Sequence, residues 1–280
     1  MKQTLIFLIF LLSLIAVFYS CDRFVVISPD KFKDGKQITD DNTNDPIIDP
    51  TDDIVDPTDD IIDPTTDIIT GLYAFYEFED QYKDSTTNGR DLLPMNTISV
   101  NANGKKGSAA YFSQGSDRLE LENFMPINTL NALSFTGWIK RSGTGTLTIF
   151  NLSGSTIIQT NQIKSWLYDS GGMKLFGIIS NNDTKSITTL STNTWYHVAI
   201  VYYLESNSNP NNYLMKLYLN GELEATKETA ISPVSTDGFL TIGSSVGYSN
   251  YFYGYMDQLR FYNVALTEDQ IKAIMTADSD

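Results

Sequence analysis

Cysteine and histidine are nearly absent from this sequence of 280 residues, which has one of each, Cys21 and His197. A single cysteine cannot form a disulfide within the chain, and a single histidine excludes a metal site built from several imidazoles. His197 lies inside an apolar, alternating stretch of sequence. We therefore predict a buried structural histidine rather than a catalytic base.

Positive charge is also scarce, with 19 Lys and Arg against 34 Asp and Glu and a net charge of −15. Binding to phosphates or to anionic lipid needs a cluster of basic residues, and the sequence has none. This argues against nucleic acid as a partner and against electrostatic docking on a membrane. The sequence also lacks a glycine-rich phosphate loop that opens a helix, which argues against an α/β nucleotide-binding enzyme.

The N-terminus has the pattern of a secretion signal. Lys2 is followed by an apolar run from Leu5 to Phe18, which is too short to span a membrane comfortably. The run ends at Ser20 and Cys21, an arrangement that resembles a bacterial lipobox. This resemblance implies a signal peptide over residues 1–20, lipidation of Cys21, and attachment to the cell envelope or surface through the lipid alone. The alternative is an ordinary secretory signal and a secreted protein.

Residues 21–70 are expected to form a disordered acidic linker. Three consecutive repeats of seven residues occupy positions 49–55, 56–62 and 63–69, and each begins with Asp-Pro-Thr. The proline in each repeat breaks a helix, and the repeated acidic charges stretch the chain. Rows of Asp also suggest a calcium-binding β-roll, but such rolls need Gly-rich turns, and the repeat contains no glycine. A spacer is the simpler interpretation.

After the linker, short apolar stretches with a period of two alternate with Gly-, Asn- and Ser-rich turns, which is typical of a β-sandwich. Thr267 and Gln270 form a capping-box pattern that predicts a short C-terminal helix. The fold class is therefore all-β, an antiparallel β-sandwich. The expected strands are 72–78, 107–113, 118–121, 133–140, 147–150, 157–158, 175–179, 195–202, 213–219, 222–226, 240–242 and 258–262.

The closing segment from Gly254 to Ile271 carries a specific resemblance. It has the pattern Gly-x-x-Asp-x-Leu-Arg-Phe-Tyr-Asn-x-Ala-Leu-Thr-x-x-x-Ile, which resembles the end of laminin G-like jelly-roll domains in the concanavalin A-like lectin/glucanase superfamily. The Trp-x-His-Val-Ala block around His197 and the hairpin turn at Asn220 and Gly221 are also similar to that family. The resemblance covers about residues 71–277 and implies a single jelly roll there.

The resemblance also implies a possible structural calcium ion, because related domains often hold one near the turn after the first strand. Asp80 and Asp84 follow that strand, and Asp257 precedes the closing strand. Carboxylates are the ligands that calcium prefers, so these three are the candidate metal ligands. The alternative is that Asp84 and Asp257 cap turns and bond Arg260 or backbone amides.

The predicted function is non-catalytic binding of a glycan. Glycosidases of the superfamily carry a Glu-x-Asp-x-x-Glu strand, and this sequence has no such set. Sugar binders combine aromatic walls with a few polar groups. Candidate ligand-binding residues are therefore Tyr248, Asn250 and Tyr251 in one loop, and Trp166 and Tyr168 in an expected mid-chain loop. An extracellular protein ligand and a glycoside hydrolase are the alternatives.

Overall fold

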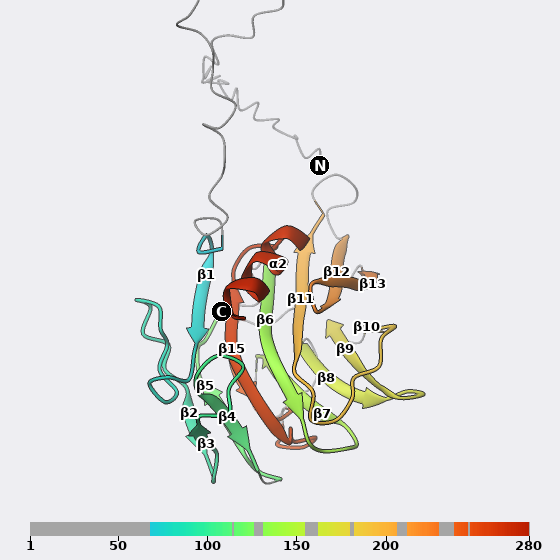
Figure 1. The fold of residues 1–280 in the computed structure, drawn as a ribbon. Helices are drawn as coiled ribbons and strands as arrows, with labels where there is room; N and C mark the ends of the chain where they lie inside the picture. The colour runs from blue at the N-terminus through green and yellow to red at the C-terminus, as the bar shows by residue number, and fades with distance from the viewer. Residues whose placement is uncertain are drawn as a thin grey trace, which may run out of the picture. The chain divides into compact units, whose positions relative to one another are not determined.

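A computed structural model describes residues 68–113, 115–125, 131–154, 162–179, 182–205, 212–229, 238–245 and 247–279 (Figure 1). All of them belong to one compact unit. Several expectations from the sequence fall outside the described residues, namely the signal peptide, the expected lipidation at Cys21, residues 21–67 of the linker and the strand at 157–158. Among the described residues, no helix is both long enough and apolar enough to cross a membrane.

The described chain forms two antiparallel sheets packed face to face, which confirms the predicted β-sandwich with its short C-terminal helix. The first sheet has eight strands, in the order β13 (Glu222–Thr229), β12 (Tyr213–Leu219), β11 (Tyr196–Leu204), β6 (Ala132–Arg141), β15 (Gly254–Tyr262), β4 (Ala109–Phe112) and β3 (Ser99–Asn101), while β1 (Leu72–Tyr76) also pairs with β15. The second has seven strands, in the order β10 (Asn182–Lys185), β9 (Met173–Ile179), β8 (Ile163–Asp169), β7 (Leu147–Ser153), β14 (Phe239–Ile242), β5 (Arg118–Leu121) and β2 (Leu93–Met95).

The core lies between the two sheets and is rich in aromatic rings. Phe135 on β6 packs against Phe150 on β7, with ring centroids 4.5 Å apart, and against Phe261 on β15 at 5.0 Å. These contacts join strands of both sheets, so they hold the sandwich together. Trp138 points to the opposite side of β6, where its ring lies 5.3 Å from that of His197. Phe135 and Trp138 therefore lie on opposite faces of β6.

His197 is fully buried, as predicted for a structural histidine. Neither of its ring nitrogens has a hydrogen-bond partner among the described residues. Burial, together with the nearby positive charge of Arg260, lowers the pKa of His197 to about 3. The imidazole is therefore neutral at physiological pH and packs as an apolar group.

Strand β15 contains a β-bulge, which determines which of its side chains lie on the outer face of the eight-stranded sheet. Its register shifts between Asp257 and Arg260, and Gln258 has a φ of 52°. The extra residue directs Asp257 and Arg260 to the same side of the sheet, although they are three positions apart. The arginine then forms a buried ion pair with Asp278, which follows the C-terminal helix.

Helix α2 (Glu268–Ala277) begins with the predicted capping box between Thr267 and Gln270. Its buried residues Ile271 and Ile274 pack in a second apolar cluster with residues of β11, β12 and β15. Figure 1 shows the helix lying over the strands of the eight-stranded sheet. The helix therefore covers part of the outer face of that sheet.

Candidate functional site

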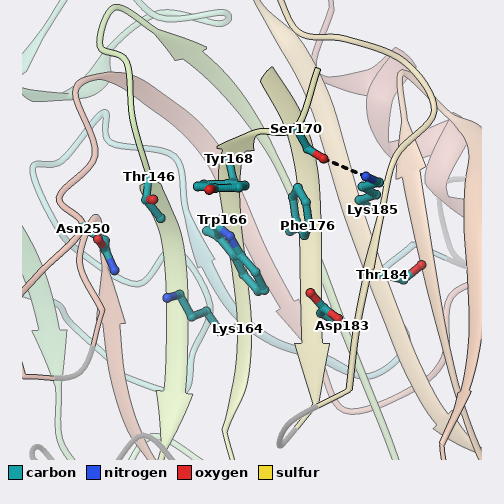
Figure 2. A pocket seen from close by; sticks show the side chains of 10 residues that line it. All are labelled: Thr146, Lys164, Trp166, Tyr168, Ser170, Phe176, Asp183, Thr184, Lys185 and Asn250. Atoms are coloured by element: carbon teal, nitrogen blue, oxygen red, sulfur yellow. Dashed lines mark hydrogen bonds between the residues drawn. The ribbon is translucent and has the colours of Figure 1, made fainter. Parts of the chain in front are cut away.

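The outer face of the seven-stranded sheet carries a hollow of about 700 Å³ (Figure 2). Side chains from β8, β9 and β10 and from three neighbouring loops surround it. The lining residues are Thr146, Lys164, Trp166, Tyr168, Ser170, Phe176, Asp183, Thr184, Lys185 and Asn250. The hollow therefore combines aromatic rings, lysines, hydroxyls and one carboxylate on the side of the sheet away from the core.

The alternation of β8 places its side chains in the hollow. Ile163 and Leu167 point into the core, so Lys164, Trp166 and Tyr168 point outward from the same strand. The neighbouring strand β9 supplies Phe176, whose backbone lies directly opposite Trp166. A regular two-residue repeat on β8 thus creates a row of exposed and half-buried side chains.

The aromatic rings of this row are ordered by contacts with one another. Trp166 stacks on Phe176 with centroids 5.2 Å apart and an angle of 24° between the ring planes. Tyr168 meets the edge of Phe176 at 5.9 Å. Because Phe176 is buried, it holds the two more exposed rings in place. A flat apolar wall results, which is suited to the face of a ring-shaped ligand.

Lys164 is a half-buried cation at the other end of the row. Its Nζ donates a hydrogen bond of 2.6 Å to Oγ of Ser245 and lies 5.0 Å from the centroid of the Trp166 ring. Burial lowers the pKa of Lys164 to about 8. No carboxylate of the described residues forms an ion pair with it. The ammonium is therefore held in position without a negative partner.

Ser245 stands in the centre of the sequence Gly-Ser-Ser-Val-Gly, positions 243–247, which has the Gly-x-Ser-x-Gly form of many hydrolases. A serine beside a lysine of lowered pKa can act as a nucleophile with a base. Here the serine is only 2% exposed, does not line the hollow, and is also hydrogen-bonded to Thr148 Oγ1. The arrangement therefore positions Lys164 rather than presenting a nucleophile.

The far wall of the hollow is polar. Lys185 on β10 donates a hydrogen bond of 2.7 Å to Ser170, and Asp183 lies two residues earlier on the same strand. The exposed Asn250 lies on the opposite side of the aromatic rings, in the loop between β14 and β15 (Figure 2). The backbone carbonyl of Asn250 accepts a hydrogen bond of 2.9 Å from Thr148 N, which fixes that loop to the sheet.

Three of the five predicted ligand-binding residues come together in the hollow: Trp166, Tyr168 and Asn250. Trp166 and Tyr168 were expected in a loop, and that expectation is wrong because both lie on β8. Tyr248 and Tyr251 do not line the hollow. Tyr248 instead packs under Arg118, with the guanidinium 4.0 Å from its ring centroid, and its carbonyl accepts a hydrogen bond from the Tyr251 hydroxyl.

Sequence reasoning missed Lys164, Phe176, Asp183 and Lys185. For the lysine a signal was present, because Lys164, Trp166 and Tyr168 recur every second residue between the apolar positions of β8. For the others, only the pairing of β9 and β10 with β8 reveals the shared surface.

The predicted metal ligand Asp84 is a turn residue. Its carboxylate accepts hydrogen bonds from the backbone N–H groups of Phe75, Thr86 and Arg90, at 3.0–3.1 Å, and from the Thr86 hydroxyl. Four donors already surround both oxygens, so this side chain stabilises the turn after β1. The alternative that Asp84 caps a turn is the one that the structure shows.

Asp257 is likewise occupied by backbone groups. One oxygen accepts from Lys106 N at 2.9 Å and the other from Gln258 N at 2.7 Å. Burial raises the pKa of Asp257 to about 7. Arg260, which was suggested as its partner, pairs with Asp278 instead.

The structure does not assemble the predicted calcium ligands. Asp80 is exposed, whereas Asp84 and Asp257 are buried in separate hydrogen-bond networks. Within the described part of the chain, no group of three or more Asp, Glu, His or Cys side chains is placed to hold a metal ion. The structure therefore does not bring Asp80, Asp84 and Asp257 together, and calcium binding stays a prediction.

Comparison with known families agrees with this architecture. Residues 113–272 match the profile of a laminin G-type family described as the concanavalin A-like lectin/glucanases superfamily. The match covers more than half of the chain, and the chain belongs to this superfamily. No curated protein sequence is similar enough to count as a match.

Several solved structures share this fold. Domain 4 of AbnA, an extracellular GH43 arabinanase from Geobacillus stearothermophilus, solved in complex with arabinotriose, is 21% identical with a TM-score of 0.57; the match covers 72% of this chain and 97% of that one. The receptor-binding domain of botulinum neurotoxin D is 18% identical, with a TM-score of 0.57 and coverages of 75% and 53%. The binding domain of Paraclostridial Mosquitocidal Protein 1 is 14% identical, with a TM-score of 0.59 and coverages of 75% and 53%. This chain thus spans about half of each toxin domain, and these identities show a shared fold alone.

Proposed function

We propose that the protein is a non-catalytic carbohydrate-binding module and that the hollow around Trp166 is its binding site. The observation that carries the proposal is the Trp166–Phe176 stack, bordered by Lys164 and Asn250. Sugar rings present apolar C–H faces and polar edges, so they suit an aromatic wall rimmed by donors and acceptors. The arabinotriose complex of the AbnA domain supports the proposal by analogy, because that domain shares the fold.

The lining of the hollow favours binding over hydrolysis. Glycoside hydrolysis by the common mechanisms needs two carboxyl groups that flank the sugar bond. Among the lining residues Asp183 is the only carboxylate. Substrate cleavage at this site would therefore need a second acid that the described lining does not supply, and we assign the site to ligand retention.

A glycan array with the purified full chain, kept in mild detergent because of its apolar N-terminus, tests the proposal. We expect a defined set of glycans to bind, and Trp166→Ala to weaken the best one by about 10- to 30-fold, as for a central aromatic anchor. Trp195→Ala is the matched control, since Trp195 is a half-buried tryptophan near Tyr255 on the other sheet. It should change affinity less than about twofold, which is the scale of a surface substitution.

The outcomes separate the candidate functions. Binding to deglycosylated extracellular proteins without binding to glycans would replace the proposal with protein adhesion. Release of shortened products from a bound glycan would replace it with hydrolysis. Equal losses in both tryptophan variants, with unchanged melting curves, would show that the hollow is not the site.

We further propose that Cys21 is lipidated and holds the protein at the cell envelope, with residues 22–70 as a spacer. Expression of Cys21→Ser in a bacterial host tests this, because loss of lipid moves the protein from the detergent phase to the aqueous phase in phase partitioning. Unchanged partitioning would argue for a secreted protein.

Bound calcium stays a prediction, which calorimetric titration after chelator treatment would test.

A further inference from the structure

The charges of the hollow differ in sign from those of the protein as a whole. The chain has a net charge of −15, yet the charged residues that line the hollow are Lys164, Lys185 and Asp183. The hollow is therefore a locally positive site on an acidic protein. Such a site attracts a negative group on a ligand.

Asp183 does not neutralise Lys164, although both lie in one row across the sheet. Both residues pair with Ile178 on β9, so two strand spacings separate them, about 10 Å between Cα atoms. The lysine side chain turns the other way, toward Ser245. Figure 2 shows Lys164 and Asp183 on opposite sides of the aromatic rings.

Among the residues that the structure describes, no other acid pairs with Lys164. Its remaining cross-strand neighbour is Asn151 on β7, a neutral amide. The segment between the described parts of β7 and β8, positions 155–161, contains no Asp or Glu. Partial burial of an ammonium group without a counter-charge is unfavourable, and burial is the cause of the lowered pKa of this lysine.

We infer that the ligand of this hollow is an acidic saccharide, whose sugar ring lies on Trp166 while its carboxylate pairs with Lys164. The inference rests on the proposed function and narrows it to glycans that contain uronic or similar carboxylated sugars. The carboxylate supplies the missing counter-charge, and Ser245 orients the ammonium. Asp183 disfavours densely charged chains such as polysulfated glycans, because it places a negative charge in the same row.

The test uses the full chain and an array with neutral, uronic-acid, sialylated and sulfated glycans. We expect carboxylated glycans to dominate the bound set. Lys164→Gln should weaken them by about 10- to 100-fold, the scale of a charge-assisted hydrogen bond. The control Lys216→Gln removes a lysine that lies over Tyr203 on the other sheet, and should leave affinity unchanged.

A second measurement avoids any effect of the substitution on folding. Methyl esterification of the best carboxylated glycan removes its charge and should weaken binding to the unmodified protein by a similar factor. Raising the pH from 7.5 to 9.5 should also weaken the acid form roughly tenfold, because Lys164 loses its proton near pH 8. The other titratable groups that line the hollow are Tyr168, Lys185 and Asp183. If Lys164 is the group responsible, Lys164→Gln should abolish the pH dependence of binding.

The possible results distinguish the acidic-ligand inference from the proposed carbohydrate-binding function. Equal binding of esterified and acidic forms, or of neutral and acidic glycans, would overturn the acidic ligand and leave the carbohydrate-binding site in place. Preference for sulfated over carboxylated glycans would also overturn it. Absence of binding to any glycan would remove the proposed function and the inference together.

Discussion

The buried pair between Arg260 and Asp278 should dominate the stability of the outer, helix-covered face. Nη2 of the arginine lies 2.7 Å from Oδ1 of the aspartate, and Nη1 lies 2.8 Å from Oδ2. The arginine is 8% exposed and the aspartate 1%. The guanidinium also lies 3.8 Å from the ring centroid of Phe75 on β1. Asp278→Asn would keep the shape of the side chain but leave the buried arginine without its counter-charge.

The expected loss is large because the remaining charge cannot reach water. Removing one partner of a buried pair costs about 3–5 kcal/mol, whereas exposed pairs contribute about 0–1 kcal/mol. For a domain of this size, the loss corresponds to a decrease in melting temperature of roughly 6–20 °C. The comparison is Glu222→Gln, which removes an exposed ion pair of 3.2 Å with Lys272.

Urea unfolding followed by tryptophan fluorescence would measure both free energies of unfolding. Binding at the hollow should be unchanged in both variants, because the pair lies on the opposite sheet. A loss below about 1 kcal/mol in Asp278→Asn, equal to that of the exposed control, would refute the claim that burial determines the strength of this pair.

Other predictions concern Asp257, Asp84 and Asn250. Burial raises the pKa of Asp257 from 3.8 to about 7, so between these pH values the native state binds more protons than the unfolded state. The free energy of unfolding should therefore fall as the pH rises from 4 to 7. Urea unfolding should show a smaller fall in Asp257→Asn, because the amide does not titrate. Asp84→Ala removes four hydrogen bonds and should lower the free energy of unfolding by about 2–4 kcal/mol in the same assay, whereas the exposed Asp80→Ala should change it by less than about 0.5 kcal/mol. Asn250→Gly should weaken glycan binding in calorimetry about fivefold without a change in melting temperature, because glycine keeps the positive φ of 54° at this position.

Much of the fold could be predicted because its signals are local. The capping box fixes the start of α2 at Thr267, and the Asn220–Gly221 turn fixes the hairpin of β12 and β13. Each depends on residues within a few positions of one another. The alternation of apolar and polar residues located most strands, because one face of each strand packs in the core and the pattern is again local in the sequence.

The missed strands lack such signals. β2 and β3 have three residues each, β2 contains Pro94, and β10 has the polar sequence Asn-Asp-Thr-Lys. These segments extend because longer neighbours supply hydrogen-bond partners, and sequence patterns do not contain that information. β8 was missed because the buried Ser165 stands between Ile163 and Leu167 and interrupts its apolar face.

The kinds of side chain in the site could be predicted from the sequence, but only some of the residues that form it could. Aromatic and amide composition indicated Trp166, Tyr168 and Asn250, which meet in the hollow. The same reasoning selected Tyr248 and Tyr251, whose contacts lie elsewhere. Which aromatics share a surface depends on the register of β8 against β9, and register arises from pairing across the sheet.

The first described residues, Ile68 and Leu72, pack in the apolar cluster that also holds Ile271 and Ile274 of α2. The polypeptide thus enters the sandwich on the sheet that does not carry the hollow. An attachment made at Ile68 would therefore hold the domain through the sheet opposite to the one that carries Trp166. Capture experiments with a chain shortened to that residue would keep the surface around Trp166 away from the point of attachment.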